Sequence, residues 1–495
     1  MFPHSPTQCN VESALKQVLE LGRWLTGAVA AGTAEHEVER HLFTQLLRTG
    51  ATLLGEFLAS VGPGDLGETV TLGDGQVLRR LPERSRRRLV TVFGPFAIPR
   101  VVYGSRFGQR IELVPTDQRL QLPETDVSYL LQDWSQQMGV EQPFGTVAGS
   151  LRTILGLKQS VDTLEHGNQQ MAESAAAFRA QQPAPDPAAE GELLVVSEDN
   201  KGVPMVRPVE AAAPVGAHRK KGEKANKKQM ATIGVAYTVD RHVRTPEELV
   251  AALFRDPGHA RGEAPEACQK RYWAELTREV AGAVVRAQDQ VFQHLRDELK
   301  QRRTAGQILV HLSDGQASLE QDRRAYLPRD RRTVDILDLL HVNPRLWEAA
   351  HLFHAEGSDE ATAFVRARML LVLQGKAEQV VADLRKTGAE LRGAKAARLR
   401  KLCAFLENNL HRMHYGRYLR AGYPIATGVI EGACRHVIKD RMERAGMRWK
   451  VPGAEAMLEL RTIETNGDWA AFQRYRIGAE TMRLYPHAEH FAAAA

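Results

Sequence analysis

Apolar residues recur every three or four positions over the first 60 residues, which predicts helix. Leu15, Val18 and Leu25 fall on one face of the first helix, with Gly22 as a gap in the stripe. A second helix is expected to follow and to end at the glycine- and proline-containing stretch 60–64. The chain therefore opens with two amphipathic helices.

A β-hairpin is expected next. Two runs rich in β-branched and aromatic residues, 89–93 and 98–103, flank the turn-forming pair Gly94-Pro95. Just before them lies a cluster of arginines: Arg79, Arg80, Arg84, Arg86, Arg87 and Arg88. On a hairpin edge this cluster is suited either to contact phosphates or to keep a solvated edge from aggregating.

Residues 125–178 have a helical pattern that contains helix-turn-helix spacing. One helix is expected to end at Gly156, and Ser160 is a suitable N-cap for the next. This spacing is typical of DNA-binding motifs but also of any helical hairpin. The Pro- and Ala-rich stretch 181–191 then predicts an interdomain linker.

After the linker the pattern changes to short apolar runs separated by helices. Strands are expected at 193–199, 202–207, 230–238, 308–312 and 333–338, the first three successive and antiparallel. Helices are expected at 265–302, 344–414 and 427–444. The resulting order, β-β-β-α-β-β-α, predicts an α+β fold with an RNase H-like mixed sheet and a large all-helical insertion.

Three carboxylates occupy informative places in this order. Asp199 and Asp314 follow the first and fourth strands, and Glu431 lies on the last helix. Each taken singly is a turn or cap residue. In an RNase H-like sheet the two strands are adjacent, so the acids come together at the sheet end. Three neighbouring carboxylates repel one another unless cations neutralise them, and oxygen ligands select Mg²⁺ or Mn²⁺.

Five stretches of this region resemble the DDE transposases of bacterial insertion sequences. They are 199–205 (DNKGVPM), 311–315 (HLSDG), 334–341 (VDILDLLH), 428–436 (GVIEGACRH) and 441–449 (RMERAGMRW). The similarity is to the Kra-type family, which is related in layout to the Mutator-like transposases. It implies Asp199, Asp314 and Glu431 as a triad that binds two Mg²⁺ ions, and residues 344–423 as an insertion before the final helix. Relatives commonly carry cysteines after the hairpin, and this chain has none there.

Several acidic and imidazole groups near the triad have open roles. Glu198 adjoins Asp199 but points to the other face of a strand, so only one can face the metals; the resemblance favours Asp199. Asp335 and Asp338 on the fifth strand are rival ligands. His341, three residues after Asp338, either supports the site and the DNA or is a structural histidine at a strand–helix junction.

Basic residues near the triad predict a DNA surface. The first group lies between the second and third strands, where it either clamps the DNA backbone or forms a solvated loop: Arg219, Lys220, Lys221, Lys224, Lys227 and Lys228. The second recurs at helical spacing after Glu431, as Arg435, Lys439 and Arg441. Trp449 is expected in the core rather than stacked on a base.

Composition limits the class of protein. The chain has 495 residues, a formal net charge of +6, 43% hydrophobic and 25% charged residues. These values exclude wholesale disorder and fit about three domains. The four cysteines form no Cys-x-x-Cys pair, which argues against a zinc site or a disulfide framework and for a reducing bacterial cytoplasm. No membrane span or signal peptide is expected.

Together these observations predict a DNA transposase that cleaves element ends and transfers strands into target DNA. Its partners are double-stranded DNA and a second copy of the chain, because two ends must be paired. A metal-dependent nuclease and an inactive DNA-binding protein remain alternatives. The expected regions are a DNA-end-binding part at 1–180, a linker at 181–191, a catalytic core at 192–343 and 424–450, an insertion at 344–423 and a tail at 451–495.

Overall fold

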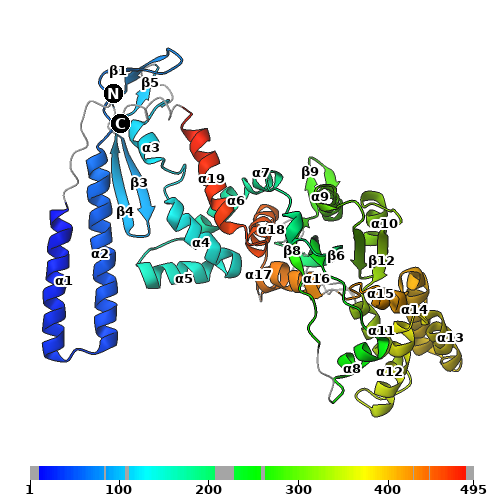
Figure 1. The fold of residues 1–495 in the computed structure, drawn as a ribbon. Helices are drawn as coiled ribbons and strands as arrows, with labels where there is room; N and C mark the ends of the chain where they lie inside the picture. The colour runs from blue at the N-terminus through cyan, green and yellow to red at the C-terminus, as the bar shows by residue number, and fades with distance from the viewer. Residues whose placement is uncertain are drawn as a thin grey trace, which may run out of the picture. The chain divides into compact units, whose positions relative to one another are not determined.

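A computed structural model describes residues 11–82, 85–105, 111–206, 228–257, 262–426, 428–444 and 446–486. The chain forms two units, Met1–Phe178 with Asp468–Ala495, and Arg179–Gly467 (Figure 1). The second unit contains all three residues of the expected triad.

The first unit begins with two long helices, as the apolar periodicity predicts. These are α1 (Glu12–Ala31) and α2 (Glu35–Val61), joined by a short turn in which Gly32 has a φ of 65°. The helices are antiparallel neighbours: the Gln17 amide donates to Thr52 Oγ1 over 3.0 Å, and the Trp24 ring stacks on His41 with centroids 3.8 Å apart.

The expected hairpin is present with its strands displaced along the chain. They are β3 (Ser85–Thr91) and β4 (Gly94–Arg100), and Leu58 of α2 packs with Leu89 and Ile98 in their core. A small sheet of β1 (Thr69–Thr71), β2 (Val77–Arg80) and β5 (Tyr103–Gly104) lies in the same unit.

The arginine cluster divides between internal and exposed positions. Arg80 pairs with Asp65, and Arg87 pairs with Asp117 over 2.7 Å. Arg79, Arg86 and Arg88 are exposed, and Arg84 lies outside the described residues. Part of the cluster therefore serves folding, and the rest is available to solvent.

Helices complete the first unit. They are α3 (Pro115–Leu120), α4 (Tyr129–Glu141), α5 (Phe144–Leu155), α6 (Val161–Ala172) and α19 (Trp469–Leu484), together with α7 (Ala175–Ala180), whose last two residues belong to the second unit. The helix–turn–helix geometry of α5 and α6 agrees with the sequence: Gly156 ends α5 with a φ of 69°, and the Ser160 hydroxyl accepts the Thr163 N–H at the start of α6.

The second unit is built on a five-stranded mixed sheet in the order β12-β11-β6-β7-β8. Its strands are β6 (Leu193–Pro204), β7 (Lys228–Val239), β8 (Cys268–Leu276), β11 (Ile308–Ser313) and β12 (Thr333–Leu337). The strands β6, β11 and β12 run parallel, whereas β7 is antiparallel to both β6 and β8. The fold is therefore α+β, as expected.

An expected strand and an expected helix differ from the sequence prediction. The expected second strand, 202–207, is instead the end of β6, whose ladder with β7 continues to Pro204. The expected helix 265–302 begins as β8 and the short hairpin β9 (Arg278–Val280) and β10 (Ala283–Val285), and only α9 (Ala287–Arg302) is helical. The polar residues 269–271 obscure this edge strand in the sequence.

One face of the sheet is covered by α9 and α10 (Ala317–Tyr326). Leu194 and Val196 of β6 pack there against Phe292 and Leu295 of α9 and Leu319 of α10. Residues alternate along a strand, so Leu193, Val195 and Asp199 belong to the other face.

The expected insertion is helical. It comprises the end of α11 (Leu339–Ala350), α12 (Asp359–Leu373), α13 (Ala377–Thr387), α14 (Gly393–Asn409), the 3₁₀ turn η3 (Leu410–Arg412) and α15 (Tyr415–Arg420). The unit also holds α8 (Pro246–Phe254) and, near its end, α18 (Val451–Thr465). The region expected as a tail thus contains α18 and α19, one in each unit. None of the helices in the described ranges has the length and apolarity to cross a membrane.

Candidate active site

Asp199 and Asp314 are placed side by side by strand register. Each residue of β6 pairs with the residue 115 positions later in β11, from Leu193 with Ile308 to Ser197 with Leu312. Asp199 and Asp314 have the same separation, so continuing the register by two residues sets them next to each other on one face, at a strand spacing of about 4.8 Å. Asp199 lies inside β6 rather than at its end, because β6 continues along β7.

Glu431 lies near Asp199 across a hollow of about 480 Å³. Glu431 is exposed on the short helix α16 (Gly428–Ala433). The hollow is lined by Asp199, Lys201, His341, Glu431, Cys434, Arg435, Lys439 and Asp440. The structure therefore brings five predicted site residues to one cavity, together with Lys201, Cys434 and Asp440.

Two neighbours hold the Asp199 carboxylate. Lys201 Nζ lies 2.9 Å from Asp199 Oδ2, and the Cys434 thiol donates to the same oxygen over 3.1 Å. Burial favours the neutral form of Lys201, but the hydrogen bond and charge of Asp199 outweigh it and raise the pKa of Lys201. Burial, and then Asp199, raise the pKa of Cys434 well above its ordinary value, so its thiol stays protonated.

Asp314 lies in a less solvated setting. Burial raises the pKa of Asp314, the neighbouring charge of Asp199 adds to the rise, and the Gln316 N–H and His341 oppose it. The Gln316 N–H donates to Asp314 Oδ1 over 2.7 Å. Asp314 thus shares one electrostatic environment with Asp199 and His341.

Asp338 and His341 support this edge of the sheet. The Asp338 side chain caps α11 by accepting the Leu340 N–H over 2.8 Å, and Asp338 is 2% exposed. His341 Nδ1 lies 3.7 Å from Asp338 Oδ2. The carboxylate of Asp338 raises the pKa of His341, burial opposes the rise, and Asp314 and Asp199 add to it. His341 thus lines the hollow within electrostatic reach of Asp338, Asp314 and Asp199.

The last helix is interrupted where the sequence predicts a continuous one. After α16 comes a π-helical turn, η4 (Cys434–Lys439), followed by the single turn α17 (Asp440–Met442). Such turns insert a residue into a helix and are frequent at functional sites. This one carries Cys434, Arg435 and Lys439 into the hollow.

The predicted DNA-contact residues separate into accessible and buried ones. Arg435 and Lys439 are exposed. Arg441 is instead 1% exposed, with its guanidinium 4.9 Å from the Trp449 ring centroid. In this structure Arg441 therefore does not lie on the accessible surface where DNA contact is expected, because the helix turns it into the core. Trp449 is buried as expected, and its indole donates to the Met442 carbonyl over 3.1 Å.

The basic loop between the second and third predicted strands lies mostly outside the described residues. Arg219, Lys220, Lys221, Lys224 and Lys227 belong to that part of the chain. Lys228 is described: it starts β7 and pairs with Glu443. Its side chain is half exposed.

The donor set matches a hard divalent cation in chemistry, since carboxylate oxygens are the ligands that Mg²⁺ and Mn²⁺ prefer. Within the described ranges, however, no three His, Cys, Asp or Glu side chains are gathered closely enough to hold a metal ion. The Lys201 ammonium occupies the position beside Asp199 that a cation would take. A cation at this carboxylate would therefore compete with Lys201 for Asp199.

A buried network of charged groups lies on the opposite face of the sheet. Glu198 Oε1 is 2.9 Å from His311 Nε2, and His311 Nδ1 is 3.6 Å from Asp335 Oδ1. Arg323 joins Asp335 to Glu320, each over 3.0 Å. This arrangement assigns Glu198 and Asp335 to structural pairs, away from the hollow.

Arg412 connects the helical insertion to this network. It donates over 2.9 Å to Glu320 and over 2.7 Å to the hydroxyl of Ser313, the residue before Asp314. Burial lowers the pKa of His311, but the carboxylates of Glu198 and Asp335 outweigh it and raise the pKa. Burial likewise raises the pKa of Glu198, and His311 opposes that rise. The network thus joins Glu198, Asp335 and Glu320 to His311, Arg323 and Arg412 beneath the strands that carry Asp199 and Asp314.

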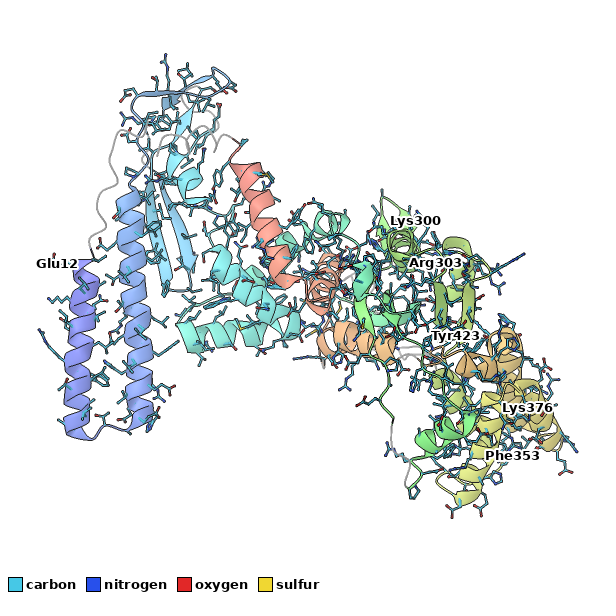
Figure 2. The ribbon with its side chains drawn as sticks, in the orientation of Figure 1. Glu12, Lys300, Arg303, Phe353, Lys376 and Tyr423 are labelled. Carbon is cyan, nitrogen blue, oxygen red and sulfur yellow. The ribbon has the colours of Figure 1, made fainter. Side chains whose placement is uncertain are left out.

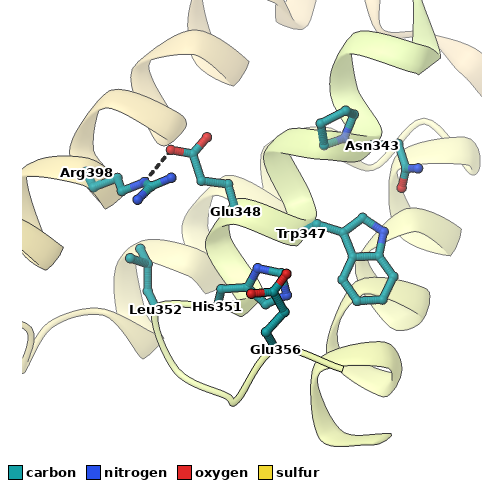
Figure 3. A pocket seen from close by; sticks show the side chains of 8 residues that line it. Asn343, Trp347, Glu348, His351, Leu352, Glu356 and Arg398 are labelled. Carbon is teal, nitrogen blue, oxygen red and sulfur yellow. Dashed lines mark hydrogen bonds and ion pairs between the residues drawn. The ribbon is translucent and has the colours of Figure 1, made fainter. Parts of the chain in front are cut away.

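A separate hollow of about 630 Å³ lies in the helical insertion (Figure 3). Trp347 and His351 of the α11 region line it, with ring centroids 5.9 Å apart, and Glu348 pairs with Arg398 at its edge. Asp199 and Glu431 of the expected triad line the other hollow, which is therefore the candidate active site; Asp314 is not among its lining residues.

Lys201 and Cys434 were given no role by sequence reasoning, although simple periodicity points to both. Lys201 is two residues from Asp199 on one strand, and therefore shares its face. Cys434 is three residues after Glu431, and therefore shares a helix face. The Glu198–His311 pair could be anticipated only in part, from the opposite orientation of Glu198.

The sequence matches no protein-family model and no curated protein. Among solved structures, the "Drosophila P element transposase strand transfer complex" is similar with a TM-score of 0.24 and 10% identity. That match covers 78% of this chain and 86% of the other. A similarity of this size carries no argument about fold or function.

Proposed function

We propose that this chain is a DDE-type DNA transposase with an RNase H-like core and with Asp199, Asp314 and Glu431 as its active-site carboxylates. The observation that supports the proposal is the parallel β6–β11 register, which pairs residues 115 positions apart up to Ser197 and Leu312 and whose continuation by two residues would set Asp199 beside Asp314. Glu431 supports it, because it lines the same hollow as Asp199 although it is 232 residues away in sequence. The sheet order, with its antiparallel second strand, and the five resembling sequence stretches add support.

The proposed reaction has two phosphoryl transfers. Water attacks the phosphorus at the element end, the bond to the element's 3′-oxygen breaks, and that oxygen leaves as a hydroxyl. The hydroxyl then attacks a target phosphodiester in line and displaces the target's 3′-oxygen. Two Mg²⁺ or Mn²⁺ ions bound at these carboxylates would supply Lewis-acid activation, and binding them would require the carboxylates to come closer together than they lie in the described structure.

The chain's own residues bind and orient the DNA in this proposal. Arg435 and Lys439 are exposed at the hollow, where their charges attract the phosphate backbone. Lys201 moves from Asp199 to a phosphate when the site is loaded. His341, held by Asp338, donates a hydrogen bond to a phosphate oxygen.

The first unit is proposed to recognise the element's terminal inverted repeats. The helix–turn–helix α5–α6 is proposed to contact base edges in a DNA groove. The phosphate backbone is proposed to be bound by the exposed Arg79, Arg86 and Arg88. Two protomers are required to pair two ends.

Strand transfer with DNA ends taken from the gene's own flanks tests the proposal. Wild type is incubated in Mg²⁺ beside Asp199→Asn and Glu431→Gln, which keep side-chain shape and remove one charge each. The proposal predicts joined product with wild type alone. Cleavage without joining would make the chain a nuclease, and equal end binding by all three proteins without reaction would make it a DNA-binding protein.

A further inference from the structure

The helical hairpin α1–α2 exposes a continuous apolar face. From the N-cap of α1 onward, the alternating spacing of four and three that defines a heptad seam is followed by Val11, Leu15, Val18, Leu25 and Val29, with Gly22 at the remaining position. Four of them are large and exposed: Val11 by 41%, Leu15 by 57%, Val18 by 51% and Val29 by 83%. A heptad seam facing solvent is a helix face without its partner.

The second helix repeats the pattern. Phe43, Leu46, Leu53 and Phe57 have the same spacing, with Gly50 between them, and all four are exposed by 41% or more. The Phe93 ring of the β3–β4 turn fills the space above Gly50: a Cβ added there would lie 2.4 Å from it. Phe93 is itself 39% exposed, so it continues the apolar surface across the glycine.

Both seams lie on the same side of the hairpin. In α1, the residues that face α2 are Ala14, Gln17 and Ala28. The seam residues Leu15, Val18 and Val29 each come one position later in the sequence. In α2, Thr49 and Thr52 face α1, and Gly50 and Leu53 likewise follow by one. A step of one residue rotates the side chain by about 100° around the helix axis. Figure 1 shows that the two helices are antiparallel. In antiparallel right-handed helices, this rotation leads to the same side of the pair.

The area is that of a protein interface. At roughly 150–200 Å² for a fully exposed residue of this size, nine half-exposed apolar residues leave on the order of 800 Å². A stable interface buries about 800 Å² on each partner, whereas the largest patch of a typical monomer is about 300–600 Å². The nine are Val11, Leu15, Val18, Leu19, Val29, Phe43, Leu46, Leu53 and Phe57.

The charges of the hairpin identify the kind of partner. Residues 12–61 hold six glutamates against four lysines and arginines, which disfavours DNA and anionic lipid. Along the outer edge of α1 the signs alternate, from Glu12 in its first turn (Figure 2) through Lys16 and Glu20 to Arg23. An edge of mixed sign can pair with an identical edge related by a two-fold axis.

We propose that two copies of this chain associate through this face, so that two α1–α2 hairpins form a four-helix bundle in the absence of DNA. The proposal does not depend on the triad or on any metal. Its test uses neither DNA nor Mg²⁺, so its failure is distinguishable from failure of the proposed function.

The test is the mass of the full chain by sedimentation equilibrium from low micromolar concentrations upward. Wild type is expected at twice 55.0 kDa. The double variant Leu15→Glu, Leu46→Glu places four charges in the interface and is expected to weaken association by roughly 100-fold or more. The control Ser13→Glu, Thr44→Glu adds the same charges to exposed positions on the back of the same helices and is expected to remain dimeric.

Circular dichroism checks that the variants are folded. If the double variant Leu15→Glu, Leu46→Glu does not fold, the double variant Val18→Gln, Leu53→Gln makes a milder change in the same seam. Wild type that stays a monomer throughout would overturn the proposal, as would a dimer that the seam variants leave unchanged. A monomer that co-sediments with anionic phospholipid vesicles would assign the face to a lipid surface instead.

Discussion

Replacing Arg412 with methionine tests whether the helical insertion stabilises the strand that precedes Asp314. Arg412 is 3% exposed and donates to Glu320, Ser313 and Asn409. Breaking a buried ion pair costs about 3–5 kcal/mol. In the Arg412→Met variant Glu320 still pairs with Arg323 and Arg324, so the loss of unfolding free energy is expected near the lower end of this range, about 3 kcal/mol. For a unit of this size, that lowers Tm by roughly 6 °C.

The same carboxylate supplies the control. Arg324 lies 2.6 Å from Glu320 but its side chain is 48% exposed, so Arg324→Met is expected to cost no more than about 1 kcal/mol. Stability is measured by urea unfolding followed by circular dichroism. In the cycle with Glu320→Gln, the double variant is expected to recover part of the loss, because it leaves no lone buried charge. Equal losses from Arg412→Met and Arg324→Met would refute the reasoning.

Three further predictions concern charge. The raised pKa of His311 means that its contribution to stability is complete below pH 6.5 and is lost as pH rises through that pKa; the difference in unfolding free energy between wild type and His311→Asn should therefore shrink at alkaline pH, and a constant difference would contradict it. Lys201→Met should tighten Mn²⁺ binding, read by electron paramagnetic resonance, by roughly fivefold or more, because the ammonium no longer competes for Asp199; unchanged affinity would separate Lys201 from the metal position. Arg435→Gln or Lys439→Gln should each reduce, by about one, the slope of the logarithm of the DNA-binding constant against the logarithm of the salt concentration. Arg441→Gln should leave this slope unchanged and lower Tm, because Arg441 is buried; the reverse pattern would place Arg441 on the DNA.

The neighbourhood of Asp199 and Asp314 is predictable from sequence because it depends on strand order and register. Asp199 and Asp314 come together once β6 and β11 are neighbouring parallel strands. Local patterns also predict α1, α2 and the α5–α6 turn, where Gly156 and Ser160 act through their own backbone and side chain.

The features missed by sequence depend on non-local contacts. Nothing in residues 265–302 distinguishes the edge strand β8 from helix until β7 is present to pair with it. Arg412 and Ser313 are 99 residues apart, so their hydrogen bond follows only from packing the insertion on the sheet. The burial of Arg441 likewise follows from the π-helical turn, which shifts the helix face after Glu431.

The most direct test of the proposed active site compares two aspartates in the strand-transfer assay. Asp314 is assigned by register, whereas Asp440 lines the hollow but is not part of the proposed triad. The account predicts that Asp314→Asn abolishes joined product and that Asp440→Asn retains it. Joined product with Asp314→Asn would contradict the assignment.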